Sequence, residues 1–145
     1  ISDLTSQERE ILSNFKYRKN KAVIHSDESV MPKNRKAWCS WNSSLNPNNN
    51  QQSSVTYWLN QLQNLKINKN IFLTINPFFN INPDMIHNMI DFTHPYYDEK
   101  ALNNQSKLSS IQNINNTLYA GSYFGYGFHE DGIKSSIEML KTLND

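Results

Sequence analysis

Three segments of the chain carry apolar residues at helical spacing. The capping-box pattern Thr5-Ser-Gln-Glu8 precedes the first segment and predicts a helix over about residues 5–15. Asp98 is a candidate cap for a second helix that runs through Ile111. The third helix is expected over about residues 131–143, where the apolar positions are Ile133, Ile137, Leu140 and Leu143.

Short runs rich in β-branched and aromatic residues predict strands between these helices. They lie at Lys21–His25, Ala37–Asn42, Ser54–Leu59, Asn70–Asn76, Met89–His94 and Thr117–Ala120. The polar stretch Asn46–Ser54 has nothing to bury and is expected to be a mobile hairpin loop. The pattern favours an α+β fold, a mixed and largely antiparallel sheet with flanking helices, as one domain over residues 1–145.

The charge balance gives little direction about partners. The net charge is +1, which supplies no general argument for nucleic acid or membrane binding. The basic segment 16–36 is interrupted by Asp27 and Glu28, so a solvated edge is favoured over a nucleic-acid site. The single Cys39 excludes an internal disulfide, and no apolar run is long enough to span a bilayer, which favours a cytoplasmic protein.

All four glycines of the chain lie within the twelve residues 121–132. They are Gly121, Gly125, Gly127 and Gly132. Glycine is required where the chain takes a positive φ or where the backbone approaches another group closely. Because this turn precedes a predicted helix N-terminus, it favours an anionic or electron-rich ligand.

The titratable side chains suggest no clear catalytic group. His129, Glu130 and Asp131 are adjacent, and capping of the helix is favoured for them over metal binding or acid–base chemistry. Cys39 is expected to be a buried, inert thiol. His25, His87 and His94 show no metal-ligand spacing, so no metal site is expected and each is interpreted as a core or edge histidine.

Four large aromatic residues form a second candidate group, Trp38, Trp41, Tyr57 and Trp58. In strands, the two members of each close pair face opposite sides of the sheet. We therefore expect one of each pair to fill the core and the other to face a ligand, with a purely structural role for all four as the alternative.

The most specific motif of the chain is the string Gly125-Tyr-Gly-Phe-His-Glu-Asp-Gly132, and three further segments support it: His94-Pro-Tyr-Tyr-Asp98, Ala37-Trp-Cys-Ser-Trp-Asn42 and Ser54-Val-Thr-Tyr-Trp58. Together these segments resemble one bacterial family of NAD/FAD-binding proteins, within the superfamily of flavin-containing amine oxidases and phytoene desaturases. The resemblance covers nearly the whole chain. Superfamily members often have an acidic residue where Ser122 stands and glycine where Ser136 stands.

The resemblance implies the C-terminal, substrate-side part of an FAD-dependent oxidoreductase, which transfers a hydride from an apolar or amine substrate to the flavin. Backbone N–H groups of Asp131, Gly132 and Ile133 would meet the flavin. The cofactor-binding residues implied are Gly121, Ser122, Gly125, Gly127, Phe128, His129, Glu130, Asp131, Gly132 and Ile133. The substrate-pocket candidates are Trp38, Trp41, Tyr57, Trp58 and His94.

The implied partner is an N-terminal Rossmann domain of the same parent protein, which would hold the rest of the FAD and which this sequence lacks. The intact parent is then expected to be an enzyme, whereas the chain by itself is expected to bind FAD weakly or not at all. The alternative is a stand-alone binding or scaffold domain that keeps the fold without catalysis.

Overall fold

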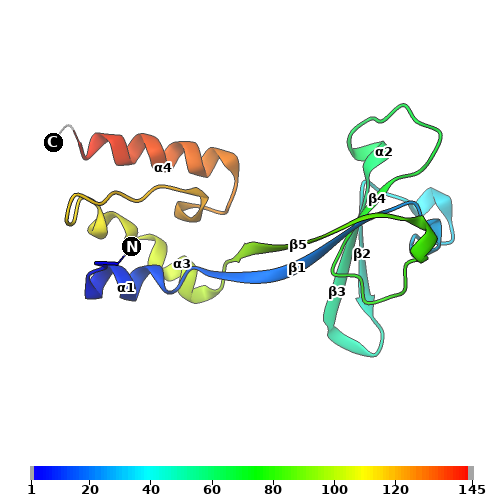
Figure 1. The fold of residues 1–145 in the computed structure, drawn as a ribbon, viewed down its shortest axis with the longest axis horizontal. Helices are drawn as coiled ribbons and strands as arrows, with labels where there is room; N and C mark the ends of the chain where they lie inside the picture. Colours follow the sequence, from blue (N-terminus) through cyan, green and yellow to red (C-terminus); the bar gives the residue numbers. More distant parts are fainter. Residues whose placement is uncertain (1, 144–145) are drawn as a thin grey trace. The chain divides into compact units, whose positions relative to one another are not determined.

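A computed structural model describes residues 2–143. Contacts divide the chain into two compact units. We call residues 19–93 the sheet unit, and residues 1–18 with 94–145 the helical unit. The strands β1 (Lys16–His25) and β5 (Ile86–Tyr96) carry the chain from one unit to the other (Figure 1). The expectation of one domain over 1–145 stays a prediction.

The fold is α+β, as predicted, with a five-stranded sheet in the order β2-β3-β4-β1-β5. The other strands are β2 (Trp41–Asn46), β3 (Asn49–Trp58) and β4 (Phe72–Ile75). The pairs β2/β3, β3/β4 and β4/β1 are antiparallel. Between the strands lie the short helix α2 (Leu59–Leu62) and the 3-10 turns η1 (Glu28–Val30), η2 (Arg35–Ala37) and η3 (Pro83–Met85).

The strand register gives the sheet two different faces. The inner face is buried and largely hydrogen-bonded: the hydroxyl oxygens of Thr56 and Thr74 lie 2.9 Å apart, and His25 Nε2 lies 2.8 Å from Thr74 Oγ1. The outer face is apolar and half-exposed, and it carries the row Trp41, Tyr57, Leu73 and Ile24, with Val55 and Ile75 in the row beyond. Only hydrogen bonding allows hydroxyls and an imidazole to occupy the buried side.

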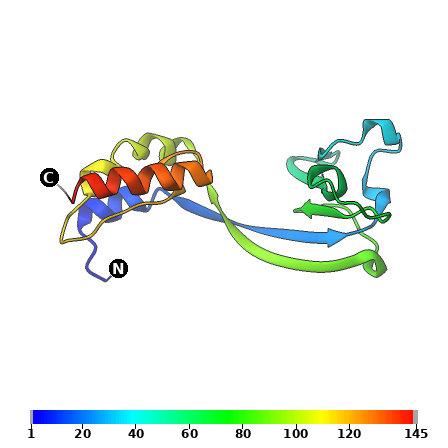
Figure 2. The same cartoon turned by 90° about the horizontal axis from the view of Figure 1, so that it is seen from above.

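The helical unit holds α1 (Ser6–Leu12), α3 (Glu99–Gln105) and α4 (His129–Lys141), with the 3-10 turns η4 (Leu108–Ile111) and η5 (Ser122–Phe124). Its core consists of Ile11, Leu108, Ile111 and Tyr119. The segment that contains η4 and η5 lies between α4 on one side and α1 with α3 on the other (Figure 1). In the turned view, α4 overlies the other helices of this unit (Figure 2).

Capping residues fix the starts of α1 and α3. The predicted capping box is confirmed: Glu8 N–H donates to Thr5 Oγ1 at 3.2 Å, and Thr5 N–H donates to Glu8 Oε2 at 2.7 Å. Tyr119 also donates its hydroxyl to the buried Glu8 at 2.8 Å. Burial and this carboxylate raise the pKa of Tyr119 to about 12, so the phenol remains a donor.

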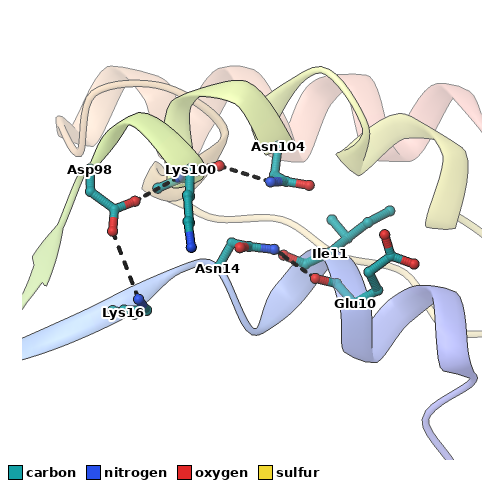
Figure 3. Close-up of polar contacts among 8 residues, drawn as sticks. Glu10, Ile11, Asn14, Lys16, Asp98, Lys100 and Asn104 are labelled. Atoms are coloured by element: carbon teal, nitrogen blue, oxygen red, sulfur yellow. Dashed lines mark hydrogen bonds and ion pairs between the residues drawn. The ribbon is translucent and has the colours of Figure 1, made fainter.

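Asp98 caps α3, also as predicted. Its carboxylate accepts from Ala101 N–H at 2.8 Å and lies 3.9 Å from Lys16 Nζ at the start of β1 (Figure 3). Asn14 ends α1 by donating its side-chain amide to the Glu10 carbonyl at 2.6 Å (Figure 3). The second predicted helix ends earlier than expected, because the chain turns after Gln105 and continues as η4.

Three local predictions about strands are wrong. Ala37–Asn42 is not a strand, because η2 occupies its start and β2 begins only at Trp41. The predicted loop 46–54 is mostly strand, since β3 already begins at Asn49 and the hairpin turns at Pro47–Asn48. Thr117–Ala120 forms only an isolated bridge between Ile114 and Thr117. Cross-strand pairing decides the first two cases, and neighbouring residues do not encode it.

Within the described residues, no helix is long and apolar enough to cross a membrane.

The buried His25 makes the stability of the chain depend on pH. Its Nδ1 accepts from Asp27 N–H at 3.2 Å, which leaves the proton on Nε2, toward Thr74. Burial lowers the pKa of His25; the Asp27 charge opposes this shift and His87 adds to it. The neutral ring therefore contributes stability above the unfolded pKa of about 6.5, and this contribution is lost as the pH falls through the lowered folded value.

We expect the free energy of unfolding to decrease between pH 7.5 and pH 5, and His25→Gln to reduce that decrease. Urea titrations at the two pH values measure it, with His129→Gln as the control because His129 is an exposed residue of the helical unit. An equal pH dependence in wild type and His25→Gln would contradict the assignment.

Candidate functional site

The glycine-rich turn 121–132 connects the core of the helical unit to α4. The chain is irregular after Tyr119, forms η5 over Ser122–Phe124, and begins α4 at His129. The carbonyl of Ser122 organises this turn, because it accepts from the N–H groups of Gly125 and Gly127, both at 3.1 Å. Backbone hydrogen bonds within the turn therefore hold its conformation.

Two polar side chains fasten the turn to neighbouring helices. The buried Ser135 of α4 accepts from Gly121 N–H at 2.9 Å and donates to the Gly132 carbonyl at 2.8 Å. Gln105, at the end of α3, donates its amide to the carbonyls of Tyr123 at 3.2 Å and Gly125 at 2.5 Å. The turn is held on both sides, and its backbone is fixed relative to α4.

Asp131 caps the N-terminus of α4, as the sequence predicted for this acidic cluster. Its Oδ2 accepts from the N–H groups of Phe128 at 2.9 Å and Tyr126 at 3.0 Å. The carboxylate also complements the positive end of the helix dipole. The neighbouring Glu130 is exposed and lies 3.9 Å from Lys134 Nζ, one turn further along the helix.

A shallow groove of about 570 Å³ runs along one side of α4, beginning at the turn. Its walls are mostly apolar, and Phe128, Ile133, Ile137 and Leu140 are each more than half exposed. The groove is lined by Ala120, Gly121, Ser122, Phe128, His129, Gly132, Ile133, Ser136, Ile137 and Leu140. The apolar stripe of α4 therefore faces this groove rather than the core.

The groove contains six of the ten predicted cofactor-binding residues: Gly121, Ser122, Phe128, His129, Gly132 and Ile133. Gly125 and Asp131 instead line a smaller hollow of about 230 Å³, together with Lys134 and Glu138. Gly127 lies against the Tyr97 ring. The sequence reasoning missed Ile137 and Leu140 as site residues, although their spacing from Ile133 carried the signal.

The three backbone donors assigned to the ligand are already hydrogen-bonded, because the N–H of Ile133, the fifth residue of α4, donates within the helix. The N–H groups of Asp131 and Gly132 both donate to the Phe128 carbonyl, at 3.1 and 3.3 Å. The N–H groups of the first helical residues, His129 and Glu130, have no partner within the helix. They are therefore the donors that the helix start offers to a ligand.

The four aromatic residues of the sheet unit separate into two pairs. Trp38 packs edge-on against Trp58, with ring centroids 5.4 Å apart, and against the fully buried Phe72 at 5.7 Å. Trp41 and Tyr57 are direct cross-strand partners on the outer face, with centroids 5.6 Å apart. Trp38 and Trp58 thus support the core, whereas their sequence neighbours Trp41 and Tyr57 face outward. The fifth pocket candidate, His94, belongs to the helical unit and is exposed.

Cys39 is exposed, so the prediction of a buried thiol is wrong. It lies outside any strand, in the short link between η2 and β2, and its Sγ lies 3.8 Å from the Ala37 carbonyl oxygen. His25 is a fully buried, hydrogen-bonded core residue, as predicted. Among the described residues, no group of three or more His, Cys, Asp or Glu side chains could hold a metal ion.

No protein-family model matches the chain, and a search of curated proteins finds no significant relative.

The capping role of Asp131 predicts the effect of its removal. Asp131→Ala leaves the N–H groups of Tyr126 and Phe128 without their acceptor, and we expect it to cost about 1 kcal/mol of unfolding free energy. Glu130→Ala is the matched control, because it removes an adjacent exposed carboxylate and is expected to change stability by less than about 0.5 kcal/mol. Urea denaturation followed by circular dichroism measures both. Equal losses in the two variants would contradict the cap.

Proposed function

We propose that this chain is the substrate-side, cofactor-contacting part of an FAD-dependent oxidoreductase of the amine oxidase type. The groove beside α4 would receive the flavin end of the cofactor. The observation that supports this most strongly is Gly132, a glycine in the first turns of α4 that no contact among the described residues 2–143 requires.

The other three glycines have internal reasons. A Cβ on Gly125 would collide with the Asp131 carboxylate, and one on Gly121 would lie 2.6 Å from the Tyr123 ring, which packs against Phe15. Gly127 has a φ of +93°, a backbone angle that residues other than glycine rarely adopt. These glycines therefore allow the turn to fold.

Gly132 differs from them in each respect. It is helical, its φ is not positive, and the nearest heavy atom to a Cβ there would be Ser122 N at 3.8 Å, an ordinary contact distance. Glycine costs a helix about 1 kcal/mol relative to alanine. Because Gly132 lines the groove, a ligand that approaches the α4 backbone closely accounts for this cost.

The chemistry of the groove suits a flavin ring. Apolar walls of Phe128, Ile133 and Ile137 would lie against a flat aromatic body, and Ser122 offers a hydroxyl at the rim. The N-terminus of the 13-residue helix α4 favours an electron-rich edge. When bound, the flavin would supply the hydride acceptor, while these residues would bind and orient the ring.

The exposed apolar stripe of α4 supports a domain partner. Ile133, Ile137 and Leu140 are 56%, 52% and 52% exposed, so full burial would stabilise each by about half of the roughly 1.5–3 kcal/mol that burying a fully exposed side chain of this kind contributes. In the proposed parent protein, a Rossmann FAD-binding domain covers this stripe and holds the rest of the cofactor. Such a partner explains apolar side chains that the helical unit leaves in solvent.

The outer face of the sheet unit is the proposed wall for an apolar or amine substrate. Trp41 and Tyr57 form its edge, and Leu73 and Ile24 continue the same row. Trp38 and Trp58 support this sheet from the inner side. No residue of the chain is assigned as a catalytic base.

One observation favours the alternative, a domain that keeps the fold without a cofactor. The Asp131 carboxylate already occupies the N-terminus of α4, and it accepts from two turn N–H groups. The Asp131 carboxylate would repel an anionic ligand at this helix N-terminus. Flavin titration separates the two proposals.

The argument from Gly132 makes a prediction about stability. Gly132→Ala is expected to raise the free energy of unfolding by about 0.5–1 kcal/mol, because the backbone is helical and a Cβ fits there. Gly125→Ala is the matched control and is expected to destabilise the chain, because its Cβ would displace Asp131. Urea denaturation measures both, and a loss of stability in Gly132→Ala would reveal an internal role for this glycine.

The flavin site predicts which part of FAD the chain recognises. In ¹⁵N–¹H spectra, FMN is expected to shift the amides of Gly132, Ile133 and Ile137 with a dissociation constant of about 1 mM or weaker. AMP carries a phosphate without the flavin ring and is expected to leave these amides unchanged.

Gly132→Val should abolish the response to FMN, whereas Lys134→Ala, a change at an exposed α4 residue outside the groove, should retain it. The absence of any FMN response at about 20 mM would overturn the flavin proposal and favour the cofactor-free domain.

A further inference from the structure

The strand β2 forms an unprotected edge of the sheet. Its six residues, Trp41–Asn46, include no charged residue and no proline. The opposite edge strand, β5, contains Asp91 and Pro95, which are typical protection against pairing with another strand. Of the two sheet edges in the described residues, β2 is therefore the one suited to strand addition.

The backbone of β2 directs alternate residues to this edge. The Ser40 carbonyl accepts from Trp58 N–H at 2.9 Å, so Ser40 and every second residue after it bond to β3. The N–H and C=O groups of Trp41, Ser43 and Leu45 then point away from β3. Within the described part of the chain, no strand pairs with them.

The same three residues place their side chains on the outer face. Trp41 is 66% exposed and Leu45 is 69% exposed, although both belong to a strand. Ser43 lies midway between them, with Trp41 two residues before it and Leu45 two residues after it. The flanking Asn42 and Ser44 are both polar.

We propose that β2 pairs antiparallel with β2 of a second copy of this chain, about a two-fold axis through Ser43. Ser43 then lies opposite Ser43 of the second copy, and Trp41 lies opposite its Leu45. A slip by one residue would place side chains of opposite faces against each other, whereas this register keeps the faces matched. The interface is isologous.

This register satisfies both the backbone and the side chains. Ser43 forms a hydrogen-bonded pair with its own copy, and the outward groups of Trp41 and Leu45 complete the ladder. Each Trp41 covers a leucine across the new strand pair, an arrangement that stabilises sheets. The outer-face row that starts at Ile24 would continue into the second copy. The proposal does not rest on flavin binding.

A six-residue strand makes a small interface, so the association is expected to be weak. We expect a monomer–dimer equilibrium with a dissociation constant between about 10 µM and 1 mM in sedimentation velocity. A chain that stays monomeric up to about 1 mM overturns the proposal. A series of larger oligomers would also overturn it, because a two-fold contact closes at the dimer.

Cysteine cross-linking tests the register in a Cys39→Ser background, which removes the exposed native thiol. Ser43→Cys is expected to form a disulfide-linked dimer, because Cα atoms of a hydrogen-bonded antiparallel pair lie about 5.5 Å apart, within disulfide range. Ser44→Cys is the matched control. It lies one residue from the axis, so its two copies are more than about 7 Å apart and should not cross-link. Equal cross-linking of both variants would overturn the register.

A charge exchange tests the side-chain pairing. Trp41→Lys and Leu45→Glu should each weaken dimerisation at least tenfold. The double variant should recover part of it, since the introduced ammonium group of one copy would then lie opposite the introduced carboxylate of the other. Ile67→Lys changes another exposed apolar residue outside the strands and should leave dimerisation unchanged. Circular dichroism confirms that each variant is folded. Failure of the double variant to exceed either single variant would overturn the proposed pairing.

Discussion

The shape of the glycine-rich turn depends on the carboxylate of Asp131. By accepting from the N–H groups of Tyr126 and Phe128, it folds the end of the turn back onto the start of α4. This position leaves no room for a Cβ on Gly125. One capping interaction therefore explains the start of the helix, one of the glycines and the close packing of the turn on α4.

The buried Ser135 extends this arrangement, because it links Gly121 to the Gly132 carbonyl and fixes the opposite end of the turn. With both ends fixed, the side of α4 that carries Ile133, Ile137 and Leu140 is left facing the groove. The glycine cluster thus has two uses. Most of it allows the turn to fold, whereas a Cβ on Gly132 would meet only an ordinary contact, and we therefore propose that this glycine serves a flavin.

The sheet shows a related division between its two faces. The inner face buries Thr56, Thr74 and His25, which is possible because each finds a hydrogen-bond partner. The outer face keeps apolar residues half-exposed, and its row ends at Trp41 on an uncharged edge. Polar burial on one side thus leaves the other side as the surface for substrate and for a second copy, according to our proposals.

Local sequence determined the features that depend on residues within one or two turns of the chain. The capping box of Thr5 and Glu8, the cap at Asp98 and the carboxylate at Asp131 were all predictable, because the interacting atoms are close in sequence. The α+β class followed from the alternation of helical and strand-like runs. Part of the candidate groove followed too, from the placement of the glycines.

Only the tertiary structure decided which side of each element is covered. It placed the apolar stripe of α4 in solvent, exposed Cys39, and separated Trp41 and Tyr57 from the core pair Trp38 and Trp58. It also converted the polar segment after Asn48 into strand β3. These outcomes depend on partners distant in sequence, because burial and cross-strand pairing arise from contacts that no local pattern specifies.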